Sequence, residues 1–279
     1  MPGIKMHPPA KTAVLVLVLV LLAALLLGKN NQSVMRFLVG QEIKLSTAAF
    51  EQTKTEHYNI KYTAIDRPYV SLISSTAEEA YTEVSRVFGT KPARKITIVV
   101  YPDSLSLSRS FGWDKDEKAM GVYWAGTIRV LSPRVWLPEE DMSVRFAQEG
   151  PMVHEFAHLL VDDISRGNYN RWWTEGIAQY VEKEITGFEF SQPFAPGEVR
   201  SYYKLNRLER EFDSLEQSVA YWESLQAIEY IAAEYGEDKV FAVLDNLGRG
   251  QSLAAAMESS LGIKYTVWEQ DFYRYLENQ

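Results

Sequence analysis

GPMVHEFAHLLVDD, from Gly150 to Asp163, is the most informative stretch of the sequence. Proline is tolerated at the first helical position, so the Gly-Pro pair at its start predicts the beginning of a helix. Residues i and i+4 of a helix share one face, so His154 and His158 can direct both imidazoles at one metal ion. Glu155 is rotated by about 100° from His154, close enough to reach a water molecule on that ion. The alternative is a helix whose two histidines pair with carboxylates at its surface.

A second segment, WWTEGIAQY from Trp172 to Tyr180, offers a third ligand. A zinc site with a position open for water uses three protein ligands. Glu175 follows His158 at a distance that allows the first helix to end and a second helix to return beside it. The small residues Gly176 and Ala178 are expected where this second helix presses against the first. The alternative is that Glu175 is an ordinary glutamate on a helix surface.

The H-E-x-x-H sequence followed by W-x-x-E-G-x-A-x-Y resembles the gluzincin metallopeptidases, specifically the small bacterial proteins described as peptidase MA-like. Thermolysin and the zinc aminopeptidases are larger relatives. The strong similarity covers about residues 150–182, and a looser one extends from about residue 57 into the C-terminal part of the chain. The resemblance implies a thermolysin-like zincin core around these motifs.

The same resemblance implies a Zn²⁺ cofactor held by His154, His158 and Glu175, with Glu155 as the general base. Zinc in such sites acidifies its bound water and polarises the scissile carbonyl. The general base takes the proton of that water and passes it to the leaving amine.

A further donor usually stabilises the developing oxyanion in this chemistry. Thermolysin-like enzymes use a histidine, but no histidine follows His158, so a side-chain donor would be a tyrosine, as in the aminopeptidase branch. The candidates are Tyr202, Tyr203, Tyr221 and Tyr230. Similar family members carry Tyr-x-x-Ser at the position of Tyr221, which we therefore favour. The alternative for Tyr221 is a core aromatic residue on an amphipathic helix.

Two polar residues are candidates for orienting the ligands. Asp162 lies one helical turn beyond His158, and Gln179 lies one turn beyond Glu175. Either side chain could fix the orientation of an imidazole. Capping or simple solvation explains each of them equally well.

The substrate side of the site is expected at the Gly121–Val130 segment, which predicts a hairpin around Ala125-Gly126. In related enzymes an edge strand near the zinc pairs with an extended peptide. The G-x-M-E-N signature of aminopeptidases is absent from the sequence, which favours an endopeptidase acting on peptide or protein substrates. The alternative function is a non-catalytic, metal-stabilised module that binds a peptide or an envelope component.

An unbroken apolar run from Ala13 to Leu27, AVLVLVLVLLAALLL, follows two lysines near the N-terminus. As a helix it spans about 22 Å, somewhat less than the ~30 Å hydrocarbon core of a bilayer. No small-x-small cleavage site follows it, so we expect an uncleaved, single-pass anchor in the cell membrane. The preceding lysines predict a cytoplasmic N-terminus and an extracytoplasmic catalytic domain. The alternative is a buried core helix or strand.

Composition limits the other classes of function. The chain has 279 residues, of which 46% are hydrophobic and 24% charged, as expected of a folded protein. A net charge of −8 argues against a protein that binds the nucleic-acid backbone, so no nucleic-acid partner is expected. The absence of cysteine excludes disulfides, thiolate nucleophiles and cysteine-ligated zinc.

The patterning predicts an α+β fold, in which a strand-rich N-terminal half with a mixed sheet precedes a helical C-terminal half. Strands are expected over 57–65 and 95–101, flanking a helix that Asp66 caps and Gly89 ends. Thr266 and Glu269 predict a capping box for the last helix. The predicted divisions are an anchor (1–28), a linker (29–50) and a catalytic domain (51–279), with strand-rich (51–138) and helical (139–279) subdomains.

Overall fold

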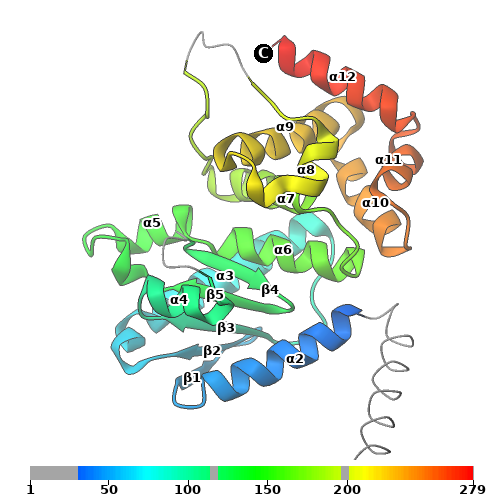
Figure 1. Cartoon of the computed structure of the whole chain (residues 1–279). Helices are drawn as coiled ribbons and strands as arrows, with labels where there is room; N and C mark the ends of the chain where they lie inside the picture. Colours follow the sequence, from blue (N-terminus) through cyan, green and yellow to red (C-terminus); the bar gives the residue numbers. More distant parts are fainter. Residues whose placement is uncertain (1–30, 114–118, 196–200, 279) are drawn as a thin grey trace, which may run out of the picture. The chain divides into compact units, whose positions relative to one another are not determined.

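The computed structural model describes residues 31–113, 119–195 and 201–278 (Figure 1). The chain divides into two units between Ser46 and Thr47. The described part of the first unit is helix α2 (Asn31–Ser46), which occupies most of the segment predicted as a linker. The predicted anchor lies outside the described residues. Within the described ranges, no helix is long and apolar enough to span a membrane.

The second unit contains a mixed sheet, as the sequence predicted, and the sheet has five strands. Its strands, in the spatial order β1-β2-β3-β5-β4, are β1 (Glu51–Lys54), β2 (Tyr58–Tyr62), β3 (Ile96–Tyr101), β5 (Thr127–Leu131) and β4 (Gly121–Trp124). The three central strands run parallel, and β1 and β4 add antiparallel at the two edges. The β4–β5 turn has positive φ at both Ala125 (45°) and Gly126 (86°), as a tight two-residue hairpin requires.

The two faces of the sheet contact different helices, because successive side chains of a strand point to opposite faces. Ile128 and Val130 belong to the hydrophobic core, together with residues of α3 (Val70–Phe88) and α6 (Met152–Ser165). Between them, Arg129 points the other way: its guanidinium lies 4.5 Å from the centre of the Phe111 ring in α4 (Ser104–Phe111). Helix α6 therefore covers the sheet face opposite to α4.

Two helix starts differ from the sequence prediction. A 3-10 helix, η1 (Ala64–Tyr69), precedes α3, and Asp66 lies within it. The buried Asp66 carboxylate accepts a hydrogen bond from Thr63 and pairs with Arg134, so it joins two segments instead of capping a helix. The predicted end of α3 is confirmed, since Gly89 adopts φ 63° there. At the last helix, Thr266 lies inside α12 after the cap residue Lys264, so the predicted capping box is wrong.

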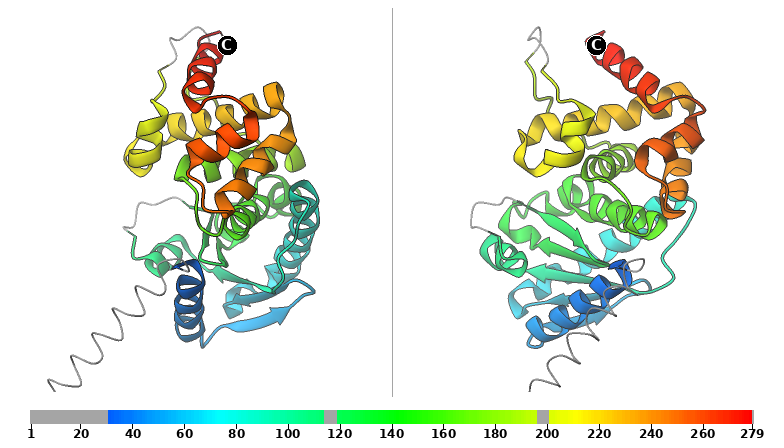
Figure 2. Two further views of the ribbon diagram at one scale, coloured as in Figure 1. Left: turned by 90° about the vertical axis from the view of Figure 1, so that its right-hand side faces the viewer. Right: turned by 45° about the vertical axis from the view of Figure 1, so that its right-hand side comes forward.

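The C-terminal half of the second unit is mostly helical. Besides α6 it contains the 3-10 helices η2 (Pro133–Val135) and η3 (Phe212–Ser214), and α5 (Met142–Glu149), α7 (Arg171–Thr186), α8 (Leu205–Glu211), α9 (Gln217–Tyr235), α10 (Glu237–Gly248), α11 (Leu253–Leu261) and α12 (Tyr265–Glu277). Helix α6 contacts β4 and α3 on one side and α7 and α10 on the other (Figure 2). It therefore lies between the sheet and the other helices.

Gly176 explains how closely α7 approaches its neighbour. A Cβ atom added there would lie 2.3 Å from the backbone oxygen of Ser224 in α9 and 2.7 Å from Ile228 Cγ1. The expectation that Gly176 allows contact with the histidine-bearing helix is wrong, because the helix that it approaches is α9. Helix α7 packs against both α6 and α9, so its position depends on both of these helices.

Candidate metal centre and catalytic site

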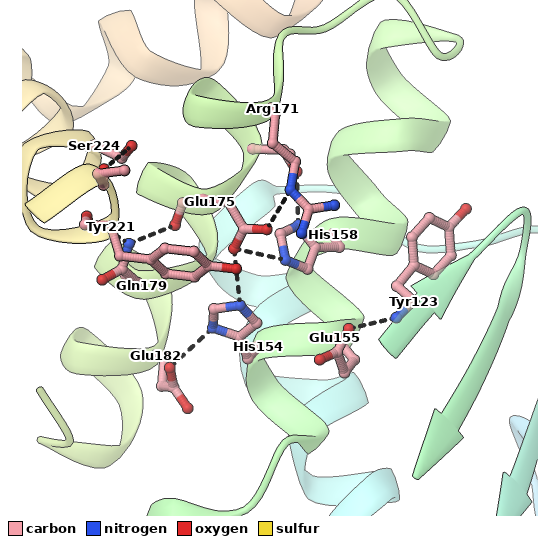
Figure 3. A network of polar contacts seen from close by, with 12 residues as sticks. Tyr123, His154, Glu155, His158, Arg171, Glu175, Gln179, Glu182, Tyr221 and Ser224 are labelled. Carbon is pink, nitrogen blue, oxygen red and sulfur yellow. Dashed lines mark hydrogen bonds and ion pairs between the residues drawn. The ribbon is translucent and has the colours of Figure 1, made fainter. Parts of the chain in front are cut away.

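Helices α6 and α7 bring the three predicted ligands together (Figure 3). The Nε2 atoms of His154 and His158 each lie 3.4 Å from Oε2 of Glu175. One ligand atom from each residue lies within 4.8 Å of the other two, which is compatible with a single small cation between them. Since i and i+4 share a helix face, the two imidazoles project from α6 toward α7 side by side.

The other ring nitrogen of each histidine is held by α7. His154 Nδ1 lies 3.0 Å from Oε2 of Glu182, and His158 Nδ1 lies 2.7 Å from Oγ1 of Thr174. These contacts fix the ring orientations and leave both Nε2 atoms directed at Glu175. In metal sites, such partners set the tautomer and the orientation of a ligating histidine.

Asp162 and Gln179, which helical spacing suggested as orienting residues, contact groups other than the imidazoles. Asp162 accepts a 2.5 Å hydrogen bond from the Tyr123 hydroxyl, so it joins α6 to β4 and does not hold His158. Gln179 donates from Nε2 to the backbone oxygens of Glu175 and Tyr221, so it joins α7 to α9. The prediction that Asp162 or Gln179 fixes the orientation of an imidazole is therefore wrong.

The two carboxylate oxygens of Glu175 have different surroundings, because Arg171 contacts only one of them. Its Nε lies 3.0 Å from Oε1, whereas Oε2 is buried and makes no hydrogen bond with the described residues. An unsatisfied buried carboxylate oxygen is costly. This Oε2 faces the two imidazole Nε2 atoms at 3.4 Å, so the donor set of two histidines and one carboxylate fits a divalent cation such as zinc.

The charges around the histidines also favour a cation. Burial alone would lower the pKa of His154, but Glu182 and Glu175 raise it well above its usual value. Burial alone would raise the pKa of Glu175, but His158, His154 and Arg171 hold it well below its usual range. The negative charges of Glu175 and Glu182 that cause these shifts would also stabilise a cation bound between the imidazoles and Glu175.

Glu155 lies beside the ligands, on the side facing the sheet edge. Its Oε2 accepts a 2.5 Å hydrogen bond from the backbone N–H of Tyr123 in β4, the edge strand expected near the site. Burial raises the pKa of this carboxyl group. A carboxylate with a raised pKa is better matched to proton transfer near neutral pH than an ordinary surface glutamate.

Tyr221 is the tyrosine candidate that the fold brings to the site. Its ring packs against Phe190 and Phe212, and its hydroxyl points toward His154 and Glu175 in Figure 3. Burial and the Glu175 charge raise its pKa, whereas Arg171 acts in the opposite direction. Ser224, three residues on, donates to the backbone oxygen of Ala220.

The other three tyrosine candidates contact other parts of the fold. The Tyr202 hydroxyl donates to Glu277 in α12, and the Tyr203 hydroxyl accepts from the backbone of Glu216. Tyr230 packs in an aromatic cluster with Trp268 and Phe272. The structure therefore brings Tyr221 to the ligands and leaves these three in other environments.

Sequence reasoning missed Thr174, Arg171 and Glu182, which surround the three ligands. Glu182 lies two turns after Glu175 on the same face of α7, a spacing that could have identified it. Arg171 precedes Glu175 by one turn, the usual spacing of a helical ion pair. Thr174 has no such signal, because its role depends on how α7 packs against α6.

Comparison with known protein families gives one match, a model described as Peptidase MA superfamily, over residues 76–278. No curated protein is similar enough to this chain to count as a match. The matched region begins within α3 and includes the strands β3, β4 and β5 and the helices that carry the site. It supports a peptidase-type hydrolase, with peptide or protein substrates, of a kind that generally depends on a metal. The chain belongs to the Peptidase MA superfamily.

Proposed function

We propose that this protein is a zinc-dependent endopeptidase of the gluzincin type, with His154, His158 and Glu175 as the metal ligands. The observation that carries the proposal is the convergence of these three side chains, with ligand atoms within 4.8 Å, beside the buried Glu155. When bound, zinc would acidify a water molecule and polarise the carbonyl of the scissile bond.

In this proposal Glu155 is the general base. Its carboxylate accepts a proton from the attacking water and then delivers that proton to the leaving amine. Burial supports this role, because it raises the pKa of Glu155 and makes the protonated carboxyl a more accessible intermediate. Tyr221 is the donor that stabilises the oxyanion, since its hydroxyl points toward the ligands.

The substrate lies along β4. This strand forms one edge of the sheet, and the hydrogen bond from its Tyr123 N–H to Glu155 places that edge beside the proposed general base. A peptide bound in extended form can pair with the outward-facing backbone groups of such an edge. Pairing with backbone requires no free terminus, which agrees with cleavage inside a chain.

Replacing Glu155 with Gln tests the proposal. Wild-type protein should carry near-stoichiometric zinc by elemental mass spectrometry and cleave members of an internally quenched peptide library with blocked ends. The Glu155→Gln variant should keep the metal and lose at least about 10²-fold in kcat/KM, because the general base is gone. Equal cleavage by both proteins would refute Glu155 as the base. Zinc binding without cleavage of any peptide would favour a non-catalytic peptide-binding module.

We also propose that residues 13–27 anchor the protein in the cell membrane, with the catalytic domain outside the cytoplasm. Support comes from the unbroken apolar run and from the lysines that precede it. The full chain should sediment with membranes and resist extraction by carbonate. Protease added to spheroplasts should digest the region after residue 30, and protection of that region would refute the orientation.

A further inference from the structure

We infer that Gly121 and Tyr123, both in β4, are positioning residues that set where the Glu155 carboxylate lies. The inference rests on the proposed function, in which Glu155 is the general base. It assigns to the edge strand a role in placing a catalytic group, separate from pairing with the substrate.

Gly121 brings β4 unusually close to the start of α6. A Cβ atom at this position would lie 2.5 Å from Pro151 Cβ and 2.9 Å from Glu155 Cγ, both shorter than real Cβ contacts. The φ angle of Gly121 is not positive, so the requirement for glycine comes from space and not from backbone strain. Any larger residue there must push β4 away from α6 or displace the side chain of Glu155.

Tyr123 attaches the same strand to α6 at two points. Its backbone N–H donates to Oε2 of Glu155, and its hydroxyl donates to Oδ2 of Asp162, two turns further along the helix. The hydroxyl also accepts a hydrogen bond from the backbone N–H of Gly126 in the β4–β5 turn. The turn, the strand and the catalytic helix are therefore joined through one side chain.

The hydrogen-bond pattern of the hairpin explains why Tyr123 N–H is available. Tyr123 is paired with Ile128 across the hairpin, yet its N–H is directed at α6 and not at β5. Amides alternate in direction along a strand, so the N–H of Val122 faces β5.

These contacts restrain Glu155 on two sides. Gly121 sets how near the strand comes to its Cγ, and Tyr123 holds one of its oxygens. A displacement of about 1 Å in a catalytic group can cost about 10²-fold in rate. The three side chains proposed as metal ligands belong to α6 and α7, whereas Gly121 and Tyr123 belong to β4.

Amide hydrogen exchange of the full chain, measured by NMR, tests the contact without requiring activity. The Tyr123 amide should exchange at least tenfold more slowly in wild type than in Glu155→Ala, while the Val122 amide, which faces β5, should exchange equally in both. Equal rates for Tyr123 in the two proteins would overturn the inference, whether or not the protein proves to be a peptidase.

Kinetics test the consequence for catalysis, with zinc content and melting temperature measured for every variant. Gly121→Ala should lower kcat at least tenfold with KM within threefold of wild type, and Tyr123→Phe should lower kcat less, because it keeps the backbone donor. Gly40→Ala, which adds the same methyl where no atom lies within 4 Å, is the control and should leave both constants unchanged. An increase in KM with unchanged kcat would mean that β4 serves substrate pairing alone and would overturn the inference. If wild type cleaves no peptide, the proposed function fails, and the exchange experiment still tests whether β4 positions the Glu155 carboxylate.

Discussion

The Nδ1 atom of His154 lies 3.0 Å from Oε2 of Glu182, so the helix that carries Glu175, the proposed carboxylate ligand, also orients this histidine. Both carboxylates come from α7, two turns apart, and both are buried. The turn of α7 that carries Glu175 therefore contributes a side chain to the cluster with His154 and His158. The turn that carries Glu182 acts on this cluster by orienting His154.

Replacing Glu182 should weaken metal binding without removing a ligand. We expect Glu182→Ala to lower the zinc affinity about 10–100-fold, because His154 loses the partner that fixes its tautomer and orientation. Glu182→Gln, which keeps an acceptor oxygen, should lose less. Competition with a chromogenic chelator measures the affinity. Glu184→Ala removes an exposed carboxylate from the same helix and is the control; an equal effect of the two alanine variants would contradict the prediction.

Removing the hydroxyl of Tyr221 should reduce turnover more than binding. We expect Tyr221→Phe to lower kcat about 10²–10³-fold, the usual cost of removing an oxyanion donor, with little change in KM or zinc content. The ring contacts with Phe190 and Phe212 persist in this variant, so the fold should be retained. Tyr202→Phe removes a hydroxyl that donates to Glu277 and should leave kcat unchanged. Full activity of Tyr221→Phe would assign Tyr221 to the core alone.

A methyl group at position 176 should destabilise the fold. Gly176→Ala places Cβ 2.3 Å from a backbone oxygen of α9, which cannot move without shifting that helix. We expect a loss of about 1–3 kcal/mol in the free energy of unfolding of the metal-free protein, as for other overpacked sites. Gly40→Ala is the matched control in α2: it adds its methyl in open space and should be neutral or slightly stabilising. Urea titrations of both variants measure the difference, and equal midpoints would contradict the prediction.

The buried Glu223 should make the stability of the protein depend on pH. Burial raises its pKa to about 8, although a hydrogen bond from the Tyr203 backbone acts in the opposite direction. Between about pH 4.5 and 8 the folded state thus holds a proton that the unfolded chain releases, so this group's contribution to stability falls as the pH rises.

Substituting Glu223 isolates that contribution. Relative to Glu223→Gln, wild type should lose stability between pH 5 and pH 8, with a slope of up to about 1.4 kcal/mol per pH unit. Chemical unfolding at several pH values measures it. Glu234→Gln removes an exposed carboxylate of α9 and should leave the wild-type slope unchanged. Parallel pH profiles for wild type and Glu223→Gln would show that Glu223 is ionised in the folded protein.

The sequence predicted the ligand geometry well because helical spacing is a local property. His154 and His158 share a face through the i, i+4 relation alone, and the mixed sheet followed from short apolar runs separated by turn residues. The partners of these side chains could not be predicted in the same way. Asp162 reaches Tyr123 because α6 lies against β4, and that packing is set by residues far away in sequence.

The missed elements have weaker local signals. Strand β1 has four residues, EQTK, with no apolar alternation, and it exists because it pairs with β2. Helix α4 is short and serine-rich, and its cap at Asp103 is its main signal. At Thr266 the local signal was present, but the helix begins one residue earlier, where Glu258 accepts a hydrogen bond from the Tyr265 backbone.

The three ligand residues lie within one helical hairpin, α6 and α7, whereas Tyr123 and Tyr221 come from elements on either side of it. Under the proposed function, mutations in β4 or α9 should lower turnover while the hairpin keeps its three metal-binding side chains. In evolutionary terms, under the proposed function, descendants of such a chain could lose turnover through changes in β4 or α9 while keeping the hairpin, which carries Glu155 as well as the three metal-binding side chains.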